Sequence, residues 1–170
     1  MPSGRVHAAM SIFAAAGLYW VAARVGASDA ACQALATGCL AGTVITPDLD
    51  VDQPTRSHYL IGRKFGLMLA LAWRLLWLPY GLSIKHRSWV SHMPLVGTAV
   101  RVVYLACFAV LLGSVSLLAG WQAPRLEELL PFFPAAFLGL SLSDLLHWAS
   151  DGLWSGFKRR MKKRYAIKTG

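Results

Sequence analysis

The sequence predicts an all-α, polytopic membrane protein with four transmembrane helices, one interfacial helix and a polar His/Asp site at the cytoplasmic face. Hydrophobic residues make up 56% of the 170 residues and charged residues only 15%, well below the roughly 25% charged of soluble domains. The mean hydropathy is +0.48. Four apolar segments approach the length of about 20 residues that a helix needs to cross a hydrocarbon core about 30 Å thick.

The four predicted spans are residues 8–23, 30–45, 95–118 and 129–150. The first carries Tyr19 and Trp20 near its end, and such side chains favour the membrane–water interface. Ser28 or Asp29 can cap the second. The chain therefore begins with two helices joined by a short polar turn.

Later spans contain residues that bear on packing and orientation. Gly38 and Gly42 form a small-xxx-small pair that permits close helix approach. Arg101 lies near the start of the third span, and we expect its side chain to snorkel outward to the membrane surface. The fourth span has Pro131 and Pro134 in its early turns.

Residues 65–80 predict an interfacial helix. This segment is apolar but is interrupted by Arg74, and Trp73, Trp77 and Tyr80 recur at the spacing of one helix face. An apolar helix with an aromatic face and a cation suits the headgroup boundary. The alternative is a fifth span.

The charge distribution fixes the expected topology. The formal charge is +9, and seven lysine and arginine residues lie between 158 and 170 with no acidic residue. We therefore predict one helical domain over residues 1–157 and a basic tail over residues 158–170, with both termini in the cytoplasm under the positive-inside rule. The tail favours the lipid bilayer and its anionic headgroups as partners and argues against nucleic acid. Four spans bring the promising His and Asp residues to one face, whereas a fifth would separate them.

Three side chains of the fourth span share one helical face. Asp144, His147 and Asp151 are separated by three and four residues. Asp-x-x-His on a helix can present two metal ligands together, and ionisable groups in an apolar segment are by default functional candidates. The alternative is that the aspartates pair with Arg or Lys at the cytoplasmic surface.

Further candidates lie in the polar segments that the topology brings to the same face. Asp48 and Asp50 follow the second span, His86 and His92 precede the third, and His7 precedes the first. The alternatives are a solvated acidic loop and a basic loop with solvated histidines. His58 lies between arginines, and we expect it at the surface.

Together these residues predict a metal site with one or two divalent transition ions, namely zinc, manganese or iron. The candidate ligands are His7, Asp48, Asp50, His86, His92, Asp144, His147 and Asp151. They exceed the needs of one tetrahedral ion and suffice for two ions about 3.5–4 Å apart. The predicted catalytic residues are Asp50 and Arg87. The guanidinium of Arg87 can stabilise charge that develops on a phosphoryl oxygen.

Four ordered motifs carry a resemblance to a known family. They are Pro2-Ser3-Gly4-Arg5-x-His7, the Pro-Asp-Leu-Asp of residues 47–50, Trp77-Leu-Pro-Tyr80 before His86-Arg-Ser-x-x-Ser-His92, and Ser143-Asp144 with Asp151. On these the chain resembles the uncharacterised metal-binding membrane proteins of bacteria, common in cyanobacteria. More distantly it is similar to the YdjM-like inner-membrane proteins described as metal-dependent hydrolases.

The resemblance implies a metal site at the membrane face and hydrolysis. It also implies a location in the bacterial cytoplasmic membrane, or the thylakoid of a cyanobacterium. Ala8 stands where those relatives often have an aspartate directly after the first histidine. A single-metal site is therefore an alternative to two ions.

Three functions follow as hypotheses. The first is a membrane metal-dependent hydrolase acting on a phosphoester, with a lipid as one candidate substrate. The second is a non-catalytic subunit, assembly partner or homo-oligomer, in which the His/Asp cluster is a structural metal site or a hydrogen-bonded scaffold. The third, an ion transporter, requires ionisable groups at mid-membrane, whereas here they gather at one face.

Overall fold

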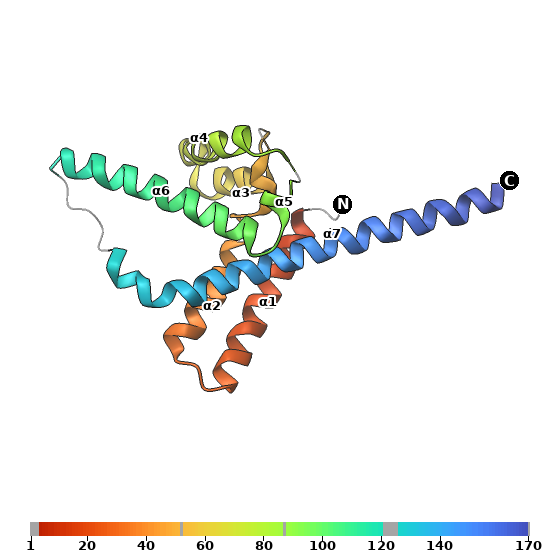
Figure 1. Cartoon of the computed structure of the whole chain (residues 1–170), viewed down its shortest axis with the longest axis horizontal. Coiled ribbons are helices and arrows are strands. Elements are labelled where there is room, and N and C mark those ends of the chain that lie inside the picture. Colours follow the sequence, from red (N-terminus) through yellow and green to blue (C-terminus); the bar gives the residue numbers. More distant parts are fainter. Residues whose placement is uncertain (1–3, 52, 87, 121–125, 170) are drawn as a thin grey trace.

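The computed structural model of the chain is helical throughout (Figure 1). It describes residues 4–51, 53–86, 88–120 and 126–169, with the side chains of these residues up to 159 apart from that of residue 126, and no strand occurs among them. The elements are α1 (Gly4–Arg24), α2 (Asp29–Ala41), η1 (Pro47–Asp50), α3 (Arg56–Phe65), α4 (Leu67–Ser83), α5 (Trp89–His92), α6 (Val96–Leu118), η2 (Leu126–Phe132) and α7 (Phe133–Thr169). The predicted all-α class is confirmed.

Two pairs of helices, α1 with α2 and α6 with α7, come together near the middle of α7. Helix α1 runs away from this region and α2 returns beside it, while α6 leaves the region and α7 comes back (Figure 1). Helices α1 and α2 both pack against α7, and α3 packs against α4 on the far side of α6. The beginning of α1, the residues after α2, the segment before α6 and the middle of α7 are therefore neighbours.

Within the part of the chain that the structure describes, three helical stretches are long and apolar enough to cross a membrane, by length and composition: Gly4–Arg24, Val96–Leu118 and Glu127–Arg159. The prediction of four is wrong at residues 30–45, because α2 has only 13 residues, which is about 20 Å. Ser28 caps α2 as expected, accepting the Ala31 N–H at 3.3 Å. After Ala41 the chain leaves the helix in hydrogen-bonded turns over residues 42–44, ahead of Pro47.

The predicted fourth span belongs to a much longer helix. Pro131 lies in the 3₁₀ turn η2, and Pro134 occupies the first turn of α7, where its missing N–H costs nothing. From there α7 continues for 37 residues through the basic tail, a length of about 55 Å. The backbone of the tail is thus an extension of the helix that carries His147.

A helix also forms where residues 65–80 predict one, but its aromatic face is turned inward. Trp77 and Tyr80 are each 2% exposed and form a core cluster with Leu49. Tyr104 of α6 completes this cluster, with its ring 5.5 Å from Trp77 and 5.4 Å from Tyr80. The expectation of an aromatic face at the headgroups is wrong for Trp77 and Tyr80, because a helix that is apolar on all sides does not reveal which face is buried.

His58 is buried rather than at the surface. Its Nδ1 accepts the Thr55 N–H at 3.0 Å and so caps α3. Burial, with a smaller contribution from the Arg74 cation, lowers the pKa of His58 below its ordinary value. The surrounding arginines in the sequence suggested a solvated site, but the side chain serves the helix start instead.

The predicted close packing at the α2 glycines is borne out. A Cβ atom at Gly38 would lie 1.9 Å from the carbonyl oxygen of Ala136, and one at Gly139 would lie 2.0 Å from that of Leu35. A Cβ atom at Gly42 would meet the Ser143 hydroxyl at 2.0 Å. The backbones of α2 and α7 are thus in direct contact at Gly38 and Gly139, while Gly42 packs against the Ser143 side chain. We call these three positions the glycine seam (Gly38, Gly42, Gly139).

Gly38→Ala is expected to destabilise the protein by about 1–3 kcal/mol, because the added methyl group forces the two backbones apart. The matched control is Gly113→Ala in α6, where a Cβ meets nothing within 4 Å. There the better helix propensity of alanine should leave stability unchanged or raise it by up to about 1 kcal/mol. Thermal unfolding followed by circular dichroism in detergent measures both, and equal melting temperatures for the two variants would contradict the expectation.

Candidate metal centre

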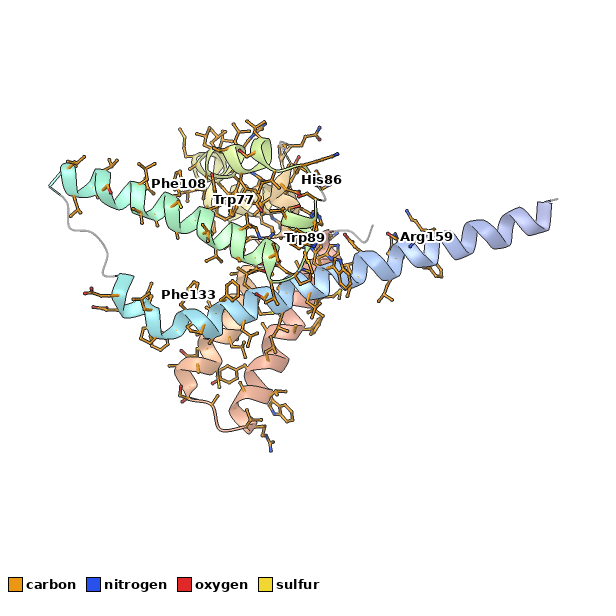
Figure 2. All side chains as sticks on the ribbon, in the orientation of Figure 1. Trp77, His86, Trp89, Phe108, Phe133 and Arg159 are labelled. Carbon is orange, nitrogen blue, oxygen red and sulfur yellow. The ribbon has the colours of Figure 1, made fainter. Side chains whose placement is uncertain are left out.

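Among the described residues, two groups of three side chains lie close enough to share a metal ion. The first group is His7, His147 and Asp151, and the second is Asp50, His86 and His92; within each, the potential ligand atoms all lie within 4.8 Å of one another. His86 and Trp89 mark the connection between α4 and α6, beside the middle of α7 (Figure 2). The two groups are called the α1/α7 group and the loop group below.

The α1/α7 group joins the start of the chain to the middle of α7. His147 and Asp151 lie one turn apart on the same face of α7, with His147 Nε2 3.7 Å from Asp151 Oδ2. His7 Nε2 lies 3.3 Å from Asp151 Oδ1, and the His7 and His147 rings stack with centroids 3.8 Å apart. Ser150 Oγ lies 3.1 Å from His7 Nδ1 and thereby fixes the orientation of that ring.

The loop group gathers around Asp50 at the end of η1. His86 Nδ1 lies 2.6 Å from Asp50 Oδ1, and His92 Nδ1 lies 3.4 Å from Asp50 Oδ2. Ser88 caps the short helix α5 by accepting the Ser91 N–H at 3.3 Å. This turn brings the two histidines, which do not share a helical face, to the same carboxylate.

Asp48 lies between the two groups. Its Oδ1 is 3.7 Å from His147 Nε2 and 4.0 Å from His92 Nε2. A carboxylate in this position can bridge two metal ions. The structure therefore connects all four chain segments that the sequence brings to one face.

The buried polar atoms of the site fit a metal ion. His92 Nε2, His147 Nε2 and Asp151 Oδ1 are buried and have no hydrogen-bond partner. Leaving such an atom unsatisfied costs about 1–3 kcal/mol, whereas metal ions held by the two groups would satisfy them. Imidazoles and carboxylates are also the ligand set that suits zinc, manganese or iron.

Asp144 belongs to neither group. Its Oδ2 accepts hydrogen bonds from Thr98 and from Arg101 of α6. Asp144 therefore pairs with a basic residue, as in the alternative raised by the sequence, but the pair is buried rather than at the surface. Arg87, the predicted catalytic cation, lies outside the described residues, while Asp50 lies at the centre of the loop group.

The expectation that Arg101 snorkels outward is wrong. Its side chain is 0% exposed, pairs with Asp144 and donates to the Ser91 carbonyl at 3.0 Å. Arg101 thus links α7 to the residue before His92. The sequence shows an arginine and an aspartate in two separate apolar segments, which is a signal for a buried ion pair. It does not show that these two residues pair with each other.

The site is open on one side. The His86 side chain is 41% exposed, whereas that of Asp50 is fully buried. A cavity of about 960 Å³ adjoins both, together with Asp48. A ligand from outside can therefore reach the loop group.

The fold and these two groups define an all-helical protein with a candidate metal centre assembled from the start of α1, the middle of α7 and the irregular segments around η1 and α5. The chain belongs to the family described as "Uncharacterized metal-binding protein (DUF2227)", which it matches over residues 2–161. The predicted family of uncharacterised metal-binding proteins is thereby confirmed over nearly the whole chain. No curated protein and no solved structure matches it. The similarity to YdjM-like proteins and a bacterial source stay predictions.

Proposed function

We propose that this protein is an integral membrane, metal-dependent hydrolase of phosphoesters with its metal centre at the cytoplasmic face. The observation that carries the proposal is the position of Asp48 between two His/Asp groups, within 4.0 Å of a histidine nitrogen of each. Enzymes that cleave phosphoesters commonly use two ions about 3.5–4 Å apart. The metal ions would be zinc, manganese or iron.

The openness of the loop group favours catalysis over a structural role. Structural metal sites are closed by protein ligands, whereas catalytic sites keep a position for water or substrate. Here the exposed His86 and the adjoining cavity leave that position accessible. Bound ions supply Lewis acidity and activate water for attack at neutral pH.

The chain's own residues would then hold and orient the reacting groups. Asp50, whose two oxygens lie against His86 and His92, keeps both rings directed at the centre. Arg87 follows His86 directly in the sequence, and we assign it the stabilisation of charge on the phosphoryl oxygens.

The membrane location rests on the three long apolar helices and the basic end of the chain. In the proposed arrangement both termini are cytoplasmic, which requires an even number of crossings. The 13-residue helix α2 and the following residues 42–45 therefore return the chain to the cytoplasmic face. The membrane is the bacterial cytoplasmic membrane, or the thylakoid in a cyanobacterium. The basic tail contacts anionic headgroups.

The test is hydrolysis of p-nitrophenyl phosphate by detergent-purified protein loaded with zinc or manganese. His86→Ala/His92→Ala is expected to lower kcat/KM at least about 100-fold, since even the loss of a residue that supports a ligand costs up to that much. His58→Gln, which changes a histidine of neither group, is the matched control and should keep the activity. Unchanged activity in the double variant would contradict the proposal.

The competing function is a non-catalytic subunit or assembly partner. Its prediction is metal bound by the wild-type protein, no turnover of any phosphoester and co-purification in fixed ratio with another membrane protein. The paired groups and the open cavity favour the hydrolase.

A further inference from the structure

The walls of the cavity beside the metal centre carry both charge and apolar surface. Asp48, Asp50 and His86 form the side that belongs to the metal centre, and the cations Arg56 and Lys85 line it as well. Arg56 Nη1 donates to the carbonyl of Gly4 at the start of α1, which fixes the guanidinium beside the cavity. The cavity is thus lined by candidate metal ligands and by two cations, namely Lys85 and Arg56, which this hydrogen bond holds in place.

The charge balance selects an anionic ligand. Two cations and two carboxylates line the cavity, and metal ions held by the carboxylates would offset their negative charge. The remaining positive charge attracts an anion, and guanidinium and ammonium groups bind phosphate oxygens through strong, charge-assisted hydrogen bonds. The hydroxyls of Thr55 and Ser83 also line the cavity and add donors.

The apolar part of the lining continues outside the cavity. Leu82 lines the cavity and is 70% exposed. Leu71 and Leu75, at 46% and 67% exposure, lie on the same face of α4 as Leu82 because their separations of four and seven residues match helical turns. These three residues form a leucine stripe that leads along α4 to the mouth of the cavity.

We propose that the cavity binds a phosphate-bearing lipid, with the phosphate between the loop group, Lys85 and Arg56, and the hydrocarbon chain along the leucine stripe. This inference rests on the proposed function, which supplies the metal ions. A soluble phosphate monoester carries the same phosphate group but has no hydrocarbon chain to contact the leucine stripe. The stripe therefore decides between the two sources of phosphate.

The experiment measures binding rather than turnover. Isothermal titration calorimetry compares dihexanoyl phosphatidate with glycerol 3-phosphate on the zinc-loaded protein in detergent. Lys85→Ala should weaken both ligands about 10- to 100-fold, the effect of losing one charge-assisted hydrogen bond. Leu82→Ser should weaken only the lipid, by about 5- to 10-fold, because the soluble ester does not reach the stripe.

Two control variants make the same chemical changes elsewhere. Lys64→Ala removes an exposed lysine that does not line the cavity, and Leu118→Ser removes a leucine that is 89% exposed at the end of α6. Both should bind the two ligands as the wild type does. Equal effects of Lys85→Ala and Lys64→Ala, or of Leu82→Ser and Leu118→Ser, would overturn the inference.

The outcomes also separate this inference from the proposed function. Lipid binding that depends on Lys85 and Leu82, without hydrolysis of any ester, supports the binding site and overturns the hydrolase. Hydrolysis of p-nitrophenyl phosphate together with equal affinity for the lipid and glycerol 3-phosphate supports the hydrolase and overturns the lipid site.

Discussion

The wild-type protein is expected to bind two divalent metal ions per chain, and each of the variants His7→Ala and His86→Ala only one. His7 contacts Asp151 of the α1/α7 group, and His86 contacts Asp50 of the loop group. Each substitution therefore removes a ligand from one group and leaves the other group complete. The measurement is metal content by inductively coupled plasma mass spectrometry after dialysis against a weak chelator.

His58→Gln is the control and should keep two ions, because His58 caps α3 and contacts neither group. A wild-type protein with one ion, lost in only one of the two variants, would support the single-metal alternative that Ala8 raises. Less than about a tenth of an equivalent after metal is added back would show that the His/Asp cluster is a hydrogen-bonded scaffold.

Arg101→Met is expected to lower the free energy of unfolding by about 3–5 kcal/mol, because it leaves the buried carboxylate of Asp144 without its cation. Arg101 is fully buried, and Asp144 is 2% exposed. The substitution also removes the hydrogen bond to the Ser91 carbonyl, next to His92. Thermal and denaturant unfolding in detergent measure the change.

The double variant Arg101→Met/Asp144→Leu distinguishes this cause from a general packing defect. Replacing both partners of a buried ion pair by apolar side chains is often neutral, so most of the stability should return. Arg74→Met, at an exposed arginine of α4, is the control for loss of charge and should change stability by less than about 0.5 kcal/mol. Equal destabilisation in the single and double variants would contradict the explanation.

Much of the fold could be predicted because long apolar segments leave few choices. Helices α1 and α6 lie within a few residues of the predicted bounds. The second span was overestimated, since hydropathy does not register the turns after Ala41 that end α2. The inward direction of Trp77 and Tyr80 depends on packing against Leu49 and Tyr104, which no local pattern specifies.

The residues of the candidate site could be predicted from the sequence, but not which of them contact one another. The sequence prediction placed His7, His147 and the loop histidines on one face of the membrane, and the structure brings them together beside the middle of α7. The division into two groups with Asp48 between them depends on side-chain directions in irregular segments. Arg101 and Asp144 are 43 residues apart, so their pairing was invisible until the helices were placed.

The glycine seam holds α2 and α7 at a short separation close to the metal centre. Gly42 and Ser143 meet at the end of the seam, and the chain then continues on one side to Asp48 and on the other to His147. Main-chain contact at Gly38 and Gly139, together with the Ser143 side chain packed on Gly42, limits how far either helix can shift toward the other. We therefore expect this packing to help set the distance between Asp48 and His147, since each follows the seam by a few residues. A methyl group added at the seam would push the two helices apart and so change the spacing of the metal ligands. Residues that do not contact the ions would therefore affect how tightly the ions bind.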